Sequence, residues 1–195
     1  MGAAQTRALA LLNHLYLLGM VVVIAGILTA AMAMQYIYGE LPCPLCLLER
    51  LALFGCAFGI LQNLRGPFSD RNTGYTLLFA LLLLIVAVRQ SLLDIYVRPG
   101  HAYIGSAVFG LHMPVWAIVI ALCLLIAIAA RLAVLGGNAH MQANGAASFP
   151  LLQRAGRLAG WYMIAICAIN FVSVIVQCGL GQCHTMGYAL LEKAV

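Results

Sequence analysis

Charged residues are scarce in this sequence, and their scarcity excludes most soluble folds. Only 8% of the 195 residues are charged, whereas 65% are hydrophobic, and the mean hydropathy is +1.03. A soluble domain of this length needs a polar surface, which so few charges cannot make. The bilayer is therefore the expected solvent, and backbone polar groups must be satisfied inside helices or a closed barrel.

Two further absences narrow the fold class and the kind of partner that the protein can bind. The long apolar runs show no alternation with a period of two, which argues against a transmembrane barrel. No cluster of basic residues accompanies the net charge of +5, so nucleic acid is not an expected partner. We therefore expect an all-α integral membrane protein with one membrane domain, residues 1–195.

Five apolar segments are long enough to cross a bilayer, which takes about 20 helical residues. The first is long for a signal peptide and lacks a convincing cleavage site before Glu40, so we keep it as a span. The stretch 136–150, rich in Gly, Ala and Asn, indicates a flexible loop. The predicted spans are approximately 15–37, 47–64, 75–93, 115–135 and 160–176.

The arginines predict the orientation, because cytoplasmic loops carry an excess of basic residues. With five spans, one side holds more of them than the other, and Arg89 falls inside the third span. The richer side, predicted to be cytoplasmic with the N-terminus, holds Arg7, Arg65, Arg71, Arg131, Arg154 and Arg157. The opposite, outer side holds the C-terminus with Arg50, Arg98 and Lys193.

Four of the seven cysteines form two close pairs, Cys43 with Cys46 and Cys178 with Cys183. Both pairs fall on the predicted outer side, where disulfides persist. The remaining cysteines, Cys56, Cys123 and Cys167, lie within apolar runs and are best explained as small buried hydrophobic residues.

The first pair stands where the second span begins. Pro44 suits the first turn of a helix, which places Cys43 near the N-cap and Cys46 within that turn. Unpaired N–H groups and the positive end of the helix dipole favour a thiolate there. Arg50 follows Cys46 by four residues, so it lies on the same face, where its charge would stabilise the anion. Glu49 lies on a different face and could pair elsewhere.

These residues also admit less specific interpretations. The pair could be a structural disulfide, a chance spacing in a cysteine-rich chain, or half of a zinc site completed by the second pair. Arg50 could be an interfacial arginine that reaches lipid phosphate. Structural disulfides would make the chain a non-catalytic membrane subunit.

The second pair follows the fifth span. Gly179 and Gly181 allow the tight backbone path of a short disulfide loop, and they leave it mobile enough for attack by a soluble partner. A clip that orders the C-terminal tail is the alternative. Two outward pairs suggest a relay, in which one disulfide accepts electrons from a soluble thiol protein and the other passes them to a membrane acceptor.

The run Cys43-Pro44-Leu45-Cys46-Leu47-Leu48-Glu49-Arg50 resembles the first-loop motif of the DsbB disulfide bond formation family. Residues 107–112 (AVFGLH) and the terminal CGLGQC, residues 178–183, are also similar to members of that family. The resemblance implies a DsbB-like four-helix bundle with a fifth transmembrane helix, in the bacterial inner membrane. It implies an oxidoreductase that reoxidises a periplasmic thioredoxin-like DsbA protein and passes electrons to ubiquinone or menaquinone.

The resemblance also implies roles for individual residues. Cys46 would be the sulfur nearest the quinone, Cys43 would exchange with the second pair, and Arg50 would stabilise the thiolate–quinone complex. One feature departs from the best-known members, which carry the second pair between the third and fourth spans. Here it follows an added fifth span, so docking and the order of exchange are open. Access slightly favours Cys183 over Cys178 as the attacked sulfur.

The loop between the third and fourth spans has other candidates. His112, and less strongly His101, could donate a hydrogen bond to a quinone oxygen or help protonate it. Histidine is also common at membrane interfaces. Trp116 and Tyr103 fit an interfacial aromatic belt without any ligand.

Overall fold

The computed structural model describes residues 3–66, 68–95, 107–135, 148–179, 183 and 187–192. In that part of the chain the regular structure is helical, apart from one isolated bridge between Val108 and Leu111. Five helices are long and apolar enough to cross a membrane, which confirms the expected all-α, multi-pass fold. They are α1 (Ala3–Ile37), α2 (Pro44–Arg65), α3 (Asp70–Ile95), α4 (Met113–Leu135) and α6 (Pro150–Cys178), and a short α7 (Ala189–Glu192) follows.

All five predicted spans fall inside these helices. Three helices, α2, α3 and α6, extend beyond the predicted apolar windows at both ends, and α1 and α4 extend only at their starts. The largest extension is at the start of α1, because hydropathy marks only the apolar part of a helix. The predicted loop at 136–150 lies mostly outside the described residues, with α6 beginning at Pro150.

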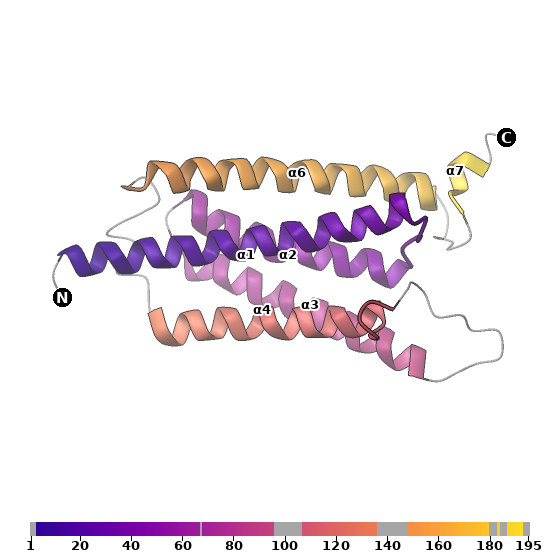
Figure 1. The fold of residues 1–195 in the computed structure, drawn as a ribbon, viewed down its shortest axis with the longest axis horizontal. Helices are drawn as coiled ribbons and strands as arrows, with labels where there is room; N and C mark the ends of the chain where they lie inside the picture. The colour runs from indigo at the N-terminus through magenta and orange to yellow at the C-terminus, as the bar shows by residue number, and fades with distance from the viewer. Residues whose placement is uncertain are drawn as a thin grey trace.

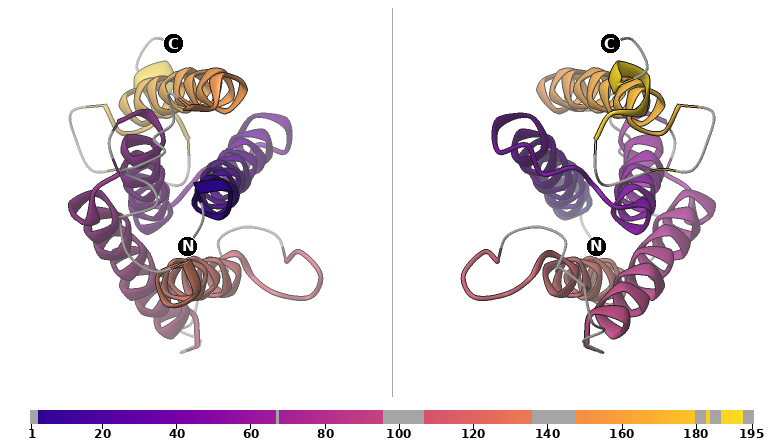
Figure 2. Two further views of the ribbon diagram at one scale, coloured as in Figure 1. Left: turned by 90° about the vertical axis from the view of Figure 1, so that its left-hand side faces the viewer. Right: turned by 90° about the vertical axis from the view of Figure 1, so that its right-hand side faces the viewer.

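Consecutive helices run in opposite directions along the long axis of the molecule (Figure 1). α2 packs against α1 and α3, and α3 packs against α4. α6 lies against α1 and α2, on the opposite side of the bundle from α4, as the two end views show (Figure 2). The fifth helix therefore covers an existing face of the bundle formed by α1 to α4.

Small residues let α2 and α3 approach closely. A side chain at Gly55 would collide with the ring of Phe79, and one at Gly59 would meet the backbone oxygen of Asn72 at 2.6 Å. Glycines four residues apart form one small face of a helix. Helices associate through such faces in a bilayer, where packing replaces the hydrophobic effect as the driving force.

Several buried polar side chains join neighbouring helices through hydrogen bonds to one another. Arg131 on α4 donates through Nε to Asn13 Oδ1 on α1 at 2.7 Å, and its guanidinium lies 4.3 Å from the centre of the Phe68 ring. Asn63 on α2 donates to Thr73 Oγ1 on α3 at 3.1 Å. These contacts join helices at the end of the bundle that holds the N-terminus.

The other end of the bundle holds both cysteine pairs. Cys43 immediately precedes α2, and Cys178 is the last residue of α6. The start of α2 and the end of α6 lie at the same end of the molecule, at the right of Figure 1. The fold therefore places both cysteine pairs at the same end of the molecule.

Candidate functional site

Cys43 and Cys46 form a disulfide at the first turn of α2, with their Cα atoms 5.0 Å apart. Cys43 is the N-cap residue, as predicted, and its Sγ accepts a hydrogen bond of 3.0 Å from the backbone N–H of Cys46. Pro44 begins the helix, where its missing N–H leaves no hydrogen bond unmade. The sulfurs therefore sit at the positive end of the α2 dipole.

A side chain from α3, Gln90, contacts both sulfurs. Its Nε2 lies 3.4 Å from Cys43 Sγ and 3.4 Å from Cys46 Sγ, and the residue is 5% exposed. Gln90 belongs to no motif of the sequence and was not predicted as a site residue. The available signal was its position near the end of the predicted third span, because polar residues inside spans are expensive and mark functional sites.

Arg50 is buried one turn below Cys46, and its guanidinium is fixed by α1 and α6. Nη1 donates to Gln35 Oε1 at 2.7 Å and to Asn170 Oδ1 at 3.1 Å, and Nη2 donates to the carbonyl oxygen of Ala31 at 3.1 Å. Its partners are neutral in the part of the chain that the structure describes. This environment differs from that of an arginine reaching lipid phosphate.

The Arg50 contacts extend into a network that sequence reasoning missed. Gln35 donates through Nε2 to Ser173 Oγ on α6 at 2.7 Å, and to the hydroxyl of Tyr188 near the C-terminus at 3.4 Å. Gln35, Asn170 and Ser173 could have been found only as polar residues within apolar helices. Their pairing depends on α6 packing against α1 and α2.

A cavity of about 160 Å³ lies beside Cys46 and Arg50. Glu49, which we expected on a different face of the helix from Cys46, also lines this cavity, because residues three apart on a helix are neighbours. Met113 and Trp116 of α4 form part of the wall. A cavity of roughly 150 Å³ accommodates a benzene ring, so a single six-membered ring fits here.

Trp116 therefore contributes to the site as well as to any interfacial belt. Its indole Nε1 donates to the carbonyl oxygen of Val108 at 2.9 Å. Val108 lies in a tight turn in which Phe109 and Gly110 both have positive φ, 52° and 79°. The turn thus fixes the orientation of an aromatic side chain in the cavity wall.

The histidine candidates are placed less directly. His112 directly precedes Met113, which lines the cavity, but His112 is not itself among the lining residues. Its carbonyl oxygen accepts hydrogen bonds from the backbone N–H groups of Val115 and Trp116 at the start of α4. His101 and Tyr103 lie outside the described residues.

Cys178 and Cys183 form the second disulfide, with their Cα atoms 4.2 Å apart. Gly179 follows the last residue of α6 with φ +59°, a conformation that glycine adopts without strain. Cys178 is 7% exposed, whereas Cys183 is half-buried. Gln177, next to Cys178, donates through Nε2 to the carbonyl oxygen of Pro42, next to Cys43, at 2.8 Å.

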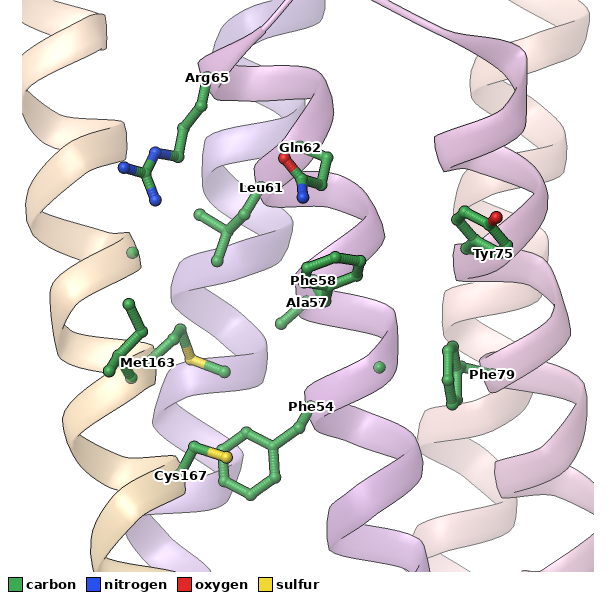
Figure 3. Close-up of a pocket in the computed structure, with 13 residues that line it drawn as sticks. Phe54, Ala57, Phe58, Leu61, Gln62, Arg65, Tyr75, Phe79, Met163 and Cys167 are labelled. Carbon is green, nitrogen blue, oxygen red and sulfur yellow. The ribbon is translucent and has the colours of Figure 1, made fainter.

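A larger groove of about 730 Å³ lies elsewhere, between α2, α3 and α6 (Figure 3). It contains neither disulfide. Its lining is apolar except near Gln62, Arg65 and Tyr75, toward the opposite end of the bundle from the cysteine pairs. The groove is therefore separate from the dithiol site.

Comparison with known proteins points to one family. Residues 13–101 match the family model described as "Disulfide bond formation protein DsbB". The chain is 33% identical over 98 residues to "Disulfide bond formation protein B" of Aromatoleum aromaticum (strain DSM 19018 / LMG 30748 / EbN1). The alignment covers 48% of this chain and 55% of that protein, so the chain spans about half the length of this curated relative. No solved structure matches the chain.

Proposed function

We propose that this chain, whose residues 13–101 match the DsbB family of disulfide bond formation proteins, is a quinone-dependent thiol:disulfide oxidoreductase. It reoxidises a periplasmic thioredoxin-like protein of the DsbA type and passes two electrons to ubiquinone or menaquinone. The catalytic cysteines are Cys43, Cys46, Cys178 and Cys183. Arg50, Cys46 and His112 are the proposed quinone-binding residues.

One observation carries the proposal: the sulfur-bearing residue Cys46 and the guanidinium of Arg50 line the same cavity. A helix N-terminus stabilises a sulfur anion, and a permanent cation one turn away adds to that stabilisation. An acceptor ring in this cavity would lie beside both groups. A purely structural disulfide needs neither the cavity nor the buried cation.

The cavity residues fit a quinone head group in chemical type. Trp116, Met113 and Leu53 provide apolar surface, while Arg50 provides N–H donors for an oxygen. His112, beside the α4 wall, is the proposed further donor. A bound quinone supplies the capacity to accept two electrons and two protons, becoming a quinol. The protein supplies binding, orientation and the thiolate.

The proposed reaction moves electrons through two dithiol pairs. A thiolate of the soluble partner attacks Cys183, the more accessible sulfur, and forms a mixed disulfide while Cys178 leaves as a thiolate that takes up a proton from water. The partner's second thiol resolves this bond, which leaves the partner oxidised and both Cys178 and Cys183 reduced. That dithiol then reduces Cys43–Cys46 by the same two exchanges, and Cys46 retains the negative charge.

The contact between Gln177 and Pro42 supports the exchange step, because these residues directly precede Cys178 and Cys43. The direction of electron transfer sets a further requirement on the reduction potentials of the two disulfides. The reduction potential of a strongly oxidising partner is roughly −120 mV, whereas that of structural disulfides is below about −300 mV. Oxidation of such a partner by a structural disulfide would therefore be unfavourable by roughly 8 kcal/mol. At least one pair must therefore be unusually oxidising.

The proposed membrane placement follows the arginines. The single domain 1–195 crosses the bacterial inner membrane five times, with its N-terminus in the cytoplasm and its C-terminus in the periplasm. This orientation puts Arg65, Arg71 and Arg154 on the inner side and both disulfides on the outer side. Lipid is then the solvent of the helical faces, and the soluble partner meets the protein at the end that carries α7.

Spectroscopic titration with quinone tests the function. Reduced protein should develop a thiolate–quinone charge-transfer band that is absent from Cys46→Ser and present in Cys167→Ser. Cys167 is a matched control outside the site; like Cys123, it was expected to be buried but is exposed in the structure. Partner-dependent quinone reduction should disappear only in Cys46→Ser. Turnover retained without Cys46 would reject the assignment, and disulfides that resist a glutathione buffer would favour the non-catalytic subunit.

A further inference from the structure

Gln90 is the side chain of the described residues that donates hydrogen bonds to the sulfurs of the first disulfide. Its Nε2 is equally close to Cys43 Sγ and Cys46 Sγ, at 3.4 Å each. Arg50, by contrast, donates to oxygen and sulfur atoms of α1 and α6, and its hydrogen bonds in the described part of the chain do not include either cysteine. The disulfide therefore accepts these side-chain hydrogen bonds from a neutral amide on α3.

The Gln90 amide has little else to hold it. Its Oε1 is buried and has no hydrogen-bond partner among the described residues, so the sulfurs are the contacts that orient the group. An amide buried in a membrane helix is costly unless its hydrogen bonds are made. This cost is explained if the N–H group has a stronger acceptor in another redox state of the protein.

We propose that Gln90 stabilises the Cys46 thiolate after the disulfide is reduced, an inference that rests on the proposed function. Two electrons break the S–S bond; one sulfur takes a proton and the other remains an anion. A disulfide sulfur is a weak acceptor, whereas a thiolate accepts a charge-assisted hydrogen bond roughly twice as strong as a neutral one. The Gln90 contact thus favours the reduced state and makes the disulfide more oxidising.

Gln90 is placed to do this without competing for the acceptor ring. Cys46 lines the cavity beside Arg50, but neither Gln90 nor Cys43 does. The amide therefore approaches the sulfurs from outside the cavity wall. In this proposal Arg50 binds the acceptor ring and stabilises the negative charge that develops there, while Gln90 donates a hydrogen bond to the Cys46 sulfur.

Replacing Gln90 by Met tests this role, because methionine keeps the length of the side chain but has no N–H donor. The reduced, quinone-free protein is treated with iodoacetamide, without the soluble partner. We expect alkylation of Cys46 to be about tenfold slower at mildly acidic pH and unchanged at alkaline pH, where the thiol is ionised in both proteins. The potential of the pair should fall by about 30 mV, the equivalent of tenfold in equilibrium constant.

The matched control is Gln62→Met on α2, which lines the distant groove and should leave both readouts unchanged. Gln90→Asn keeps the amide but shortens its reach, so it should show the same changes in alkylation rate and potential. It therefore replaces Gln90→Met as the test if the methionine variant fails to fold. Equal alkylation profiles in wild type and both Gln90 variants would overturn the proposal. Because neither measurement uses quinone or partner, this result would leave the proposed function standing.

A second inference concerns the separate groove between α2, α3 and α6. It runs along α2 from Phe54 to Arg65, about 16 Å at the rise of a helix, which is close to half of a bilayer core of about 30 Å. Figure 3 shows the Arg65 side chain extending from α2 toward α6. A Cβ atom at Gly160 of α6 would lie 3.7 Å from its guanidinium nitrogen.

The polar end of the groove is positively charged. Arg65 is exposed and makes no ion pair among the described residues. On the far side Tyr75 accepts a hydrogen bond of 2.9 Å from Arg71 Nε, and the Arg71 guanidinium lies 5.5 Å from the centre of that ring. Two arginines thus flank one end of an apolar channel that is one leaflet long.

From this charge and length we infer that the groove binds an anionic glycerophospholipid of the cytoplasmic leaflet. Its phosphate would sit at Arg65 and Arg71, and an acyl chain would lie along Phe58 toward Cys167. Basic pockets between helices on the cytoplasmic side are suited to such head groups. The site contains neither disulfide and does not depend on the redox proposal, whereas its assignment to the cytoplasmic leaflet rests on the proposed orientation.

Native mass spectrometry of protein from nanodiscs of equal phosphatidylglycerol and phosphatidylcholine tests this inference. Wild type should retain phosphatidylglycerol several-fold over phosphatidylcholine. Arg65→Gln should lose that preference, and Gly160→Phe, which fills the groove, should lose the adduct. Arg7→Gln, on the same end but outside the groove, is the matched control. Equal retention in Arg65→Gln, or a quinone or second protein copy bound in place of lipid, would overturn the assignment.

Discussion

The side-chain amide of Gln177 donates a hydrogen bond of 2.8 Å to the carbonyl oxygen of Pro42. Gln177 is fully buried, and the bond joins the end of α6 to the segment that enters α2. Residues 177 and 42 each directly precede a redox-pair cysteine. One buried contact therefore fixes the position of the second pair relative to the first.

Replacing Gln177 by Leu should slow electron transfer between the two pairs. Loss of the amide leaves the Pro42 carbonyl unsatisfied in a buried setting, at a cost of about 1–3 kcal/mol in unfolding free energy. Quinone reduction driven by the partner should fall, while reduction driven by dithiothreitol acting directly on Cys43–Cys46 should be retained. The ratio of the two rates is the measurement. Gln153→Leu, at the other end of α6, should not change that ratio.

Replacing Arg50 by Lys should weaken quinone use more than partner binding. A lysine keeps the charge but cannot donate simultaneously to Gln35, Asn170 and the Ala31 carbonyl in the same fork geometry. We expect the apparent quinone affinity to fall at least roughly tenfold, and Arg50→Ala to lose more. Steady-state kinetics at varied quinone concentration would show this. An unchanged affinity in both variants would remove Arg50 from the quinone site.

A partner that retains only its attacking cysteine should become trapped on Cys183. Cys183 is more accessible than Cys178, which is 7% exposed, so attack should occur there. Proteolysis and mass spectrometry of the mixed disulfide would identify the bonded residue. A partner found predominantly on Cys178 would reverse the proposed order of exchange.

Replacing Gly59 by Ala should destabilise the bundle by about 1–3 kcal/mol. A methyl group there would meet the Thr76 side chain and the Asn72 backbone oxygen, and backbone cannot rotate away. Thermal unfolding in detergent measures the loss. Gly26→Ala on α1, where an added Cβ has no atom within 4 Å, should not lower the unfolding temperature.

Labelling of introduced cysteines should find the two ends of the bundle on opposite sides of the membrane. With the native cysteines replaced, Tyr38→Cys near the disulfide end should react with an impermeant maleimide from the periplasm. Asp70→Cys, at the start of α3, should react only after the cytoplasmic face is opened. Labelling of position 38 from the cytoplasm alone would contradict the proposed orientation and remove the oxidising compartment that the relay needs.

The apolar runs were sufficient to predict the five helices, because a bilayer admits few alternatives to a long apolar helix. The N-cap position of Cys43 was also predictable, since Pro44 restricts the chain to the start of a helix. Local sequence was less informative about neighbours. It gave no reason to join Gln90 to Cys46, because they are 44 residues apart and meet only when α3 packs on α2.

By itself, the sequence determined the number of spans, the two close cysteine pairs and the thiolate-favouring helix start, because each depends on residues within one or two helical turns. Only the tertiary structure decided which side chains surround the sulfurs and where the added helix lies. Burial of Arg50 among Gln35 and Asn170 requires α1, α2 and α6 together. Such contacts depend on helix packing, which small residues such as Gly59 permit but which no single segment specifies.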